Sequence, residues 1–575
     1  MFIRPCQRAK NGKRHAYWAL VESYRTQRGP RQRVVAYLGD LDEKGRLGVK
    51  GAAEGRRGSE QGNLFQETEP EWVEVDAARV RVENCRDFGG PWLGLELVRT
   101  LGLDDFLERT IPAGREDVPW PMMALVLVLA RLCNPSSELH IAEHFYGQSA
   151  LSELLGVGDR KVNDDRLYRA LDALLPHKEA LEGFLKERLG TLFDLQYDLL
   201  LYDVTSTYFE GEAKGNPQAR RGYSRDHRPD CKQVCIGLVV SKDGMPLGYE
   251  VFAGNRTDVR SLKEIVEKME GRYGKARRIW VLDRGMISEE NIAFLKAGGR
   301  GYIVGTPRSM LKRFEQELLK DGWESVREGL EVKLCASADG EETFILCRSR
   351  DRREKEKAMH ARFEERIEKG LEQIKRSCTQ NRCKAATVER RVGRLLERNS
   401  RAAGLFQIDV SGEPPDGGAS VGWRKMEAWR DWAALSEGCY LLRTNLGDWS
   451  AQELWQAYMQ LTEAEAAFRI QKGDLRIRPI WHQREERVQA HILVCFLAYV
   501  LCKTLAALCR TAGLGEEPRR VLEELSKIRV VDVVLPTRQG IEIRKRCITR
   551  PNEHQAILLQ RLGLRLPVAI KMTEM

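Results

Sequence analysis

Three acidic residues, Asp203, Asp283 and Glu465, have the surroundings that a site for divalent metal ions requires. Asp203 lies within the apolar run 199–206, and Asp283 ends a second apolar run at 278–283, whereas Glu465 belongs to a helical pattern. A carboxylate in an apolar strand is costly to desolvate unless it is paired, hydrogen-bonded or bound to a cation. Two such strands and one acidic helix therefore predict a single shared cation site.

The chemistry that suits three carboxylates is phosphoryl transfer on DNA. Two divalent ions about 3.5 to 4 Å apart make an attacking oxygen nucleophilic and stabilise the leaving oxygen in line with it. Magnesium prefers a few carboxylate oxygens together with waters and substrate phosphate, so no His or Cys ligand is needed. We predict a Mg²⁺ site, in which Mn²⁺ can substitute, with Asp203 bridging both ions and Asp283 and Glu465 each completing one.

Glu465 also has a simpler interpretation. The segment 462–465, Thr-Glu-Ala-Glu, is a capping-box pattern in which Glu465 would bond backbone N–H groups at a helix start. Against this, Lys472 is seven residues further on and shares the helical stripe of Glu465, with Arg469 one turn along it. A metal ligand and cations for a phosphate would then share one face. Both interpretations remain open, and the two roles can coexist.

The order of elements around the two aspartates predicts the fold. Alternating and helical patterns predict strands ending near 207 and covering 234–240 and 247–252, a helix at 258–269, a strand ending at 283, a helix at 288–296 and a strand at 302–304. This β-β-β-α-β-α-β order is typical of a ribonuclease H-like domain. In that fold the first and fourth strands are neighbours, which would place Asp203 beside Asp283.

The whole chain is predicted to be a multidomain α+β protein, since 575 residues exceed what one core supports. Its ribonuclease H-like mixed-sheet core carries a β-rich and helical insertion, and an α-helical domain and a small N-terminal β module precede it. The predicted parts are a basic β module (1–50), a linker (51–75), an α-helical DNA-binding domain (76–190), the first part of the core (191–305), an insertion lobe (306–445), the last part of the core with the Glu465 helix (446–512) and a C-terminal tail region (513–575).

Charge favours a polyanionic partner. Lys and Arg exceed Asp and Glu by ten, and the sequence pI is about 8.9. Residues 1–37 hold nine basic side chains and one acid, Glu22, as a phosphate-binding arm would. The alternative is a solvated basic face. In the helical region, Asn163 is placed to cap a helix carrying Arg166 and Arg169, either as a DNA-recognition helix or as an ordinary amphipathic helix.

Cysteine usage and hydropathy indicate a cytoplasmic protein with no membrane partner. The fourteen cysteines have no paired spacing, and no signal peptide precedes them. The cluster His227-x3-Cys231-x3-Cys235 fits no common zinc pattern. The apolar stretch 491–509 is interrupted by Lys503 and flanked by charge, so we expect a buried helix rather than a bilayer span.

The sequence resembles a known family, the bacterial insertion-sequence transposases with a DDE triad, in the branch whose catalytic Glu lies in a Tyr-x2-Arg-x3-Glu-x6-Lys signature and follows a β-rich insertion. The resemblance is sharpest at 202–207 (Tyr-Asp-Val-Thr-Ser-Thr), at 282–286 (Leu-Asp-Arg-Gly-Met) and from Tyr458 to His482. One position departs from the signature, because Leu461 stands where the branch has Arg. The segment 254–258, Gly-Asn-Arg-Thr-Asp, also looks like a family loop, although Thr257 or Asp258 capping the next helix explains it equally.

The resemblance implies a transposase that cleaves one DNA strand at the terminal inverted repeats of an element and joins the 3′-OH to target DNA. It implies a homodimer or a larger synaptic complex on DNA, the metal-ligand roles of Asp203, Asp283 and Glu465, and contacts of Tyr458 and Lys472 to DNA near the cut. We extend the expected DNA contacts to Arg469, Arg476 and Arg478. The competing functions are a ribonuclease H-like nuclease or resolvase, and a catalytically inactive DNA-binding protein derived from such an element.

Overall fold

The computed structural model divides the chain into two compact units, Met1–Ala276 with Leu461–Met575, and Arg277–Gln460. We call them unit 1 and unit 2 and describe each by itself. The structure describes residues 2–10, 13–26, 29–39, 74–195, 197–274, 278–337, 340–381, 383–412 and 418–567. The predicted linker at 51–75 lies almost wholly outside these ranges.

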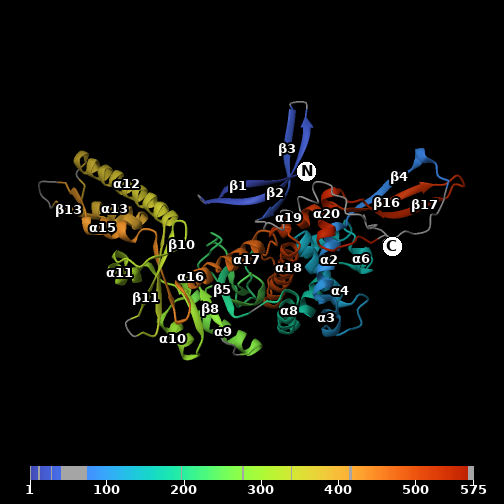
Figure 1. Cartoon of the computed structure of the whole chain (residues 1–575), viewed down its shortest axis with the longest axis horizontal. Coiled ribbons are helices and arrows are strands. Elements are labelled where there is room, and N and C mark those ends of the chain that lie inside the picture. Colours follow the sequence, from blue (N-terminus) through green and yellow to red (C-terminus); the bar gives the residue numbers. More distant parts are fainter. Residues whose placement is uncertain are drawn as a thin grey trace. The chain divides into compact units, whose positions relative to one another are not determined.

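The N-terminal part of unit 1 is a three-stranded antiparallel sheet (Figure 1). Its strands are β1 (Phe2–Lys10), β2 (Lys13–Thr26) and β3 (Gly29–Gly39), with β2 in the middle. The sequence predicted a small β module here, and the structure has a sheet of three strands.

Helices follow in unit 1, and the long apolar helix α18 (Glu485–Thr511) runs through the middle of their core. It packs against α2 (Gly89–Leu101), α4 (Trp120–Cys133) and α7 (Asp164–Leu174). Among the described residues, α18 alone is a single helix long and apolar enough to cross a bilayer, but 78% of its most apolar window is buried inside the protein. Its burial agrees with the predicted core helix. The other elements of this region are α3 (Leu103–Thr110), α5 (Glu138–His140), α6 (Leu151–Leu155), α8 (Lys178–Phe193) and α19 (Pro518–Leu525).

Three antiparallel strands of unit 1 carry the first aspartate. They are β5 (Leu199–Tyr208), β6 (Gln233–Ser241) and β7 (Pro246–Ala253), in that order across the sheet. Helix α9 (Asp258–Tyr273) follows β7 and packs against it, whereas α17 (Thr462–Lys472) packs against β5 and β6. Nearly every residue of these strands is buried, so the sheet is covered on both faces.

The C-terminal part of unit 1 contributes to a second small sheet. Strand β16 (Arg529–Pro536) lies between β17 (Glu542–Ile548) and β4 (Arg81–Asp87), and the helix α20 (Glu553–Arg561) follows. The predicted tail region thus contains regular elements, and its strands pair with a strand near the start of the helical region.

Unit 2 contains a six-stranded mixed stretch of sheet in the order β10-β11-β12-β15-β9-β8. Only β8 and β9 are parallel, as expected for strands joined by a crossover helix, here α10 (Glu289–Ala297). The strands are β8 (Ile279–Leu282), β9 (Gly301–Gly305), β10 (Glu324–Arg327), β11 (Leu330–Ala336), β12 (Thr343–Ser349) and β15 (Cys439–Thr444). Helix α16 (Ala451–Met459) packs against β9 and β11.

A second core in unit 2 is built around the long charged helix α12 (Arg350–Gln380), visible in yellow in Figure 1. Its apolar stripe packs with α13 (Ala385–Arg398) and the hairpin β13-β14 (Phe406–Ser411 and Ser420–Lys425). This charged segment forms three helices, because α12 ends at Gln380 and α13 and α14 (Ser400–Ala403) are separate. Helices α11 (Glu315–Leu319) and α15 (Glu427–Ser436) complete the unit.

The observed architecture is a mixed α+β fold with a large mixed sheet, as predicted. Along the chain, β5, β6, β7, α9, β8, α10 and β9 follow one another in the predicted order. The specific ribonuclease H-like arrangement and the division into seven parts stay predictions.

The close approach of backbone at Gly254 gives the first testable prediction. A Cβ at this position would overlap the carbonyl oxygens of Gln233 and Arg220, so Gly254→Ala should lower the free energy of unfolding by about 1–3 kcal/mol. Gly271 in α9 is the matched control, since a Cβ there meets open space and Gly271→Ala should stabilise by about 0.5–1 kcal/mol. Thermal unfolding compares the two variants, and equal midpoints would contradict the predicted clash.

Candidate catalytic site

Asp203 lies in the middle of β5 and is only partly exposed. Its neighbour Tyr202 points to the α9 side of the sheet, where its hydroxyl donates to Ser261 Oγ at 2.9 Å. Because side chains alternate along a strand, Asp203 points to the opposite face. Its Oδ1 accepts a hydrogen bond from the Val204 N–H at 2.7 Å. The strand thus presents a carboxylate within an otherwise buried apolar run, as predicted.

Helix α17, which carries Glu465, packs against β5, the strand of Asp203, and also against β6 and α18. Its buried residues are Ala464, Ala467, Phe468 and Gln471, whereas Glu465 is exposed. The N-cap position is taken by Leu461, with no side-chain capping bond, and Thr462 is already helical. The predicted capping box with Thr462 as N-cap is therefore wrong, because the helix starts one residue earlier than that pattern requires.

Lys472, at the end of α17, is held by a buried carboxylate that the sequence did not reveal. The Asp226 side chain is only 3% exposed, and its Oδ1 accepts from Lys472 Nζ at 2.8 Å and from Arg478 Nη1. Its other oxygen, Oδ2, is buried without a hydrogen-bond partner among the described residues. Burial lowers the pKa of Lys472 below its ordinary value, although Asp226 opposes this shift. Two cations thus converge on one carboxylate.

A second arginine–carboxylate pair lies close to Asp203. Arg225 Nη2 donates to both oxygens of Asp258 at 2.6 Å, and the Arg225 N–H donates to Ser206 Oγ on β5 at 3.3 Å. Burial alone would lower the pKa of Arg225, but Asp258 raises it above its ordinary value and Asp203 adds to that effect. The neighbouring helix α9 begins with Thr257 at its N-cap but without a side-chain capping bond, so the capping role predicted for Thr257 is not observed.

Unit 2 brings Asp283 and Tyr458 together. Asp283 follows β8, and Tyr458 lies in the last turn of α16. Burial raises the pKa of Tyr458, and the negative charge of Asp283 raises it further. The backbone N of Arg284, the residue after Asp283, lies beside Gly305. The tyrosine hydroxyl occupies the space next to Gly305, where any Cβ would overlap it. Two residues predicted from separate motifs thus meet within one unit.

The remaining predicted DNA contacts differ in exposure. Arg469 and Arg476 are exposed, whereas Arg478 is partly buried beside Asp226. Leu461, at the position where the signature has Arg, is buried at 7% exposure. An arginine at position 461 would have to remove its charged guanidinium from water, which is costly. The burial of this position therefore agrees with an apolar residue there.

The helix predicted from Asn163 is α7, and Asn163 Oδ1 caps it by accepting from the Arg166 N–H at 2.9 Å. Arg166 is bound to the Lys161 carbonyl and to Asp117, whereas Arg169 is 63% exposed and pairs with Asp165. The cap is confirmed, and the choice between a recognition helix and an ordinary amphipathic helix stays open.

The predicted ligands lie in both units. Asp203 and Glu465 belong to unit 1, on elements that pack together, and Asp283 belongs to unit 2. Their meeting at one metal site therefore stays a prediction. Sequence reasoning missed Asp226 and the buried group Glu138, His482 and His491, because no local spacing connects these residues.

Comparisons with known families cover most of the chain. The family described as "Transposase DDE domain" matches residues 194–501, which include all three predicted ligands. The family described as "IS1634 family transposase, N-terminal domain" matches residues 3–61. The chain is an insertion-sequence DNA transposase of the DDE family. The resemblance found from the motifs is thus confirmed at the level of the family.

Comparisons with individual proteins add little to this transposase assignment. One solved structure, described as "Cryo-EM structure of piggyBac transposase synaptic complex with hairpin DNA (SNHP)", is 9% identical to the transposase over 79% of this chain and 82% of that chain. Its TM-score of 0.33 does not establish a shared fold. No curated protein matches the transposase at a significant level.

The shared carboxylate of Asp226 leads to a prediction for the transposase. Asp226→Asn keeps the side-chain volume but removes the charge that holds Lys472 and Arg478. We expect the free energy of unfolding to fall by about 1–3 kcal/mol, because charge-assisted bonds to a buried acceptor are lost. The control is Asp230→Asn, whose carboxylate pairs with Arg228 at the surface and should leave the thermal midpoint unchanged. Equal midpoints for Asp226→Asn and the unmodified chain would show that the two cations do not depend on this carboxylate.

Proposed function

We propose that this transposase cuts and joins DNA strands with two divalent metal ions held by Asp203, Asp283 and Glu465. The observation that carries the proposal is the packing of α17 on β5, which brings Glu465 and Asp203 onto adjoining elements although they are far apart in the sequence. The family membership supports it independently, since the matched DDE domain spans all three residues.

The residues present fit magnesium better than a soft metal. The three side chains offer carboxylate oxygens only, which are the ligands that Mg²⁺ and Mn²⁺ prefer. When bound, such ions would activate the attacking oxygen and stabilise the leaving oxygen. We propose that Asp203, in the buried strand, holds both ions and that Asp283 and Glu465 hold one each.

The cations near α17 are proposed to bind the DNA backbone around the reacting phosphate. Lys472 and Arg478 share the Asp226 carboxylate, so their positions are fixed before DNA binds. Arg469 and Arg476 are exposed and available to phosphates further along the strand. Preorganised cations stabilise charge that develops in a transition state without reorganisation at the moment of reaction.

The position of Tyr458 supports the proposal that this transposase belongs to the branch with the Tyr-x2-Arg-x3-Glu-x6-Lys signature. Tyr458 lies close to Asp283 and packs beside Gly305, so its ring is fixed near a predicted ligand. The missing arginine at Leu461 leaves one expected phosphate contact unfilled, and Arg469 is the nearest candidate along the helix.

The proposal extends to the reaction partners. We propose that the transposase binds the terminal inverted repeats of its element and the target DNA, acts as a homodimer or larger synaptic complex on DNA, and works in the cytoplasm. The ribonuclease H-like core is proposed from the order β5, β6, β7, α9, β8, α10, β9 along the chain.

The ligand assignment is tested with a matched pair of substitutions on one helix. Glu465→Gln should lower Mg²⁺- or Mn²⁺-dependent cleavage of DNA carrying the element ends by more than about 100-fold, because it removes a metal ligand. Glu463→Gln is the control, since Glu463 pairs with Lys503 instead. Binding of the ends, measured by electrophoretic mobility shift, should be similar in both variants. Cleavage that survives EDTA, or equal loss in the two variants, would contradict the assignment.

The two groups of DNA contacts should have different kinetic effects. Deleting residues 1–37 should weaken DNA binding. The slope of log affinity against log salt concentration should also become shallower, by roughly 0.9 for each phosphate contact that is lost. Lys472→Ala should instead lower the cleavage rate on bound DNA more than it lowers the affinity. The lysine charge is proposed to stabilise the negative charge that develops at the reacting phosphate in the transition state. If Lys472→Ala weakens binding as much as the deletion and leaves the rate on bound DNA unchanged, α17 is a docking face and not part of the catalytic site.

A further inference from the structure

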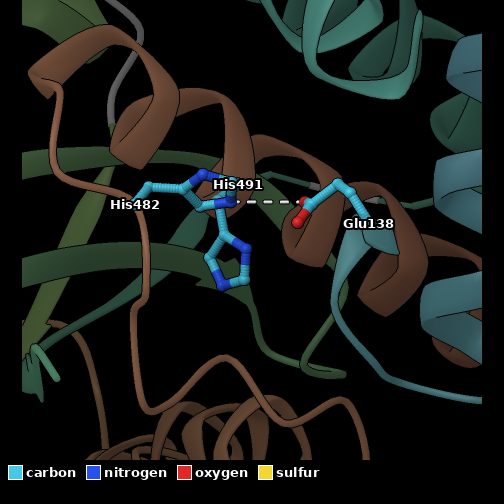
Figure 2. A group of neighbouring side chains, drawn as sticks. All are labelled: Glu138, His482 and His491. Atoms are coloured by element: carbon cyan, nitrogen blue, oxygen red, sulfur yellow. Dashed lines mark ion pairs between the residues drawn. The ribbon is translucent and has the colours of Figure 1, made fainter. Parts of the chain in front are cut away.

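Glu138, His482 and His491 form a buried group away from the predicted magnesium ligands (Figure 2). In the part of the chain that the structure describes, they are the only set of three or more His, Cys, Asp or Glu side chains whose ligand atoms all lie within 4.8 Å of one another. Glu138 begins α5, His482 lies in the connection between α17 and α18, and His491 lies in α18. All three belong to unit 1.

The distances in this group suit a small metal ion. His482 Nε2 lies 3.2 Å from Glu138 Oε1, and neighbouring ligands of a tetrahedral zinc are about 3.3 Å apart for bond lengths near 2.0–2.1 Å. The two imidazole rings are tilted by 56° with their centroids 5.3 Å apart, so they are not stacked. Cys495, one turn along α18, has its Sγ 4.0 Å from His491 Nε2 but does not belong to the group whose ligand atoms all lie within 4.8 Å of one another.

The donor types suit zinc. Neutral imidazole and ionised carboxylate are the forms that bind metal ions. Nitrogen donors favour zinc over magnesium, which separates this group from the all-carboxylate site.

Arg131 provides the competing arrangement. Its guanidinium is buried and lies 3.4 Å from His491 Nδ1, while His491 Nε2 lies 3.1 Å from the Ile477 carbonyl. In a metal-free network, Arg131 would donate to Nδ1 and Nε2–H would donate to Ile477. With Nε2–H bonded to the Ile477 carbonyl, the free lone pair of His491 is on Nδ1, and a metal ion there would replace the long contact from Arg131. Glu138 supplies negative charge for the ion.

We propose that Glu138, His482 and His491 bind one zinc ion. The ion ties the connection between α17 and α18 to α5 and to the core of the helical region. This connection carries Arg476 and Arg478, so the zinc would fix the backbone that presents two of the proposed DNA contacts. The proposed role is structural, because all three residues are buried.

The test is the metal content of the untagged full-length transposase, purified and freed of loosely bound ions on a chelating column. Mass spectrometry of the metals should find about one zinc per chain. Glu138→Gln and His482→Gln should each lower the content at least about tenfold. His144→Gln is the matched control, because His144 is an exposed histidine beside Glu143 and should leave the zinc content unchanged. Asp203→Asn should also keep the zinc, which separates this site from the proposed magnesium site.

Cobalt gives a second measurement that does not depend on the stability of the variants. Co²⁺ added to the metal-free full chain should produce the visible bands of tetrahedral coordination. Zinc below about 0.1 per chain, together with no such bands on adding Co²⁺, would overturn the proposal and establish the metal-free network of Arg131 and the two histidines.

Discussion

The packing of α17 on β5 and β6 is the constraint on which the proposed catalytic site depends. The buried residues of the helix include Ala464 and Ala467, which are small enough to permit close packing. Glu465 follows Ala464 directly and stays exposed at the edge of this contact. Asp203, within a strand buried on both sides, then has a carboxylate-bearing helix as its neighbour, so any change that moves α17 separates two predicted ligands.

Electrostatic balance around this contact comes from carboxylates that hold cations in place. Asp226 holds Lys472 and Arg478, and Asp258 holds Arg225 next to the strand of Asp203. A buried carboxylate without a partner is costly, and buried cations carry the same penalty. Pairing them lets the protein keep positive charge close to the predicted ligand Asp203 before DNA arrives, while the net charge of +10 favours the approach of a polyanion.

Local patterns predicted local structure well, and their limits follow from the same physics. The alternation in residues 199–252 predicted β5, β6 and β7, the side chain of Asn163 predicted the cap of α7, and the uninterrupted apolar run of α18 predicted a buried helix. Each of these depends on residues that are neighbours in the sequence. The capping box considered for 462–465 is not formed, because α17 has Leu461 at its N-cap, one residue before the position that the pattern requires.

Contacts between distant segments could not be read from the sequence. Strand β4 pairs with β16 near the other end of the chain, and nothing in either segment names its partner. The pairing of Lys472 with Asp226 and the meeting of Glu138 with His482 and His491 depend on tertiary packing in the same way. The predicted metal ligands could be named from the sequence only because each lies in a recognisable motif, and such motifs do not specify the packing that would bring the three together.

The most direct measurement of the central claim is anomalous diffraction from Mn²⁺ in crystals of the full-length transposase bound to its element ends. The account predicts two manganese peaks about 4 Å apart, with Asp203 between them and with Asp283 and Glu465 each bound to one ion. Peaks bound to Asp203 and Asp283 but not to Glu465, or an ion on Glu465 remote from the other two, would contradict it.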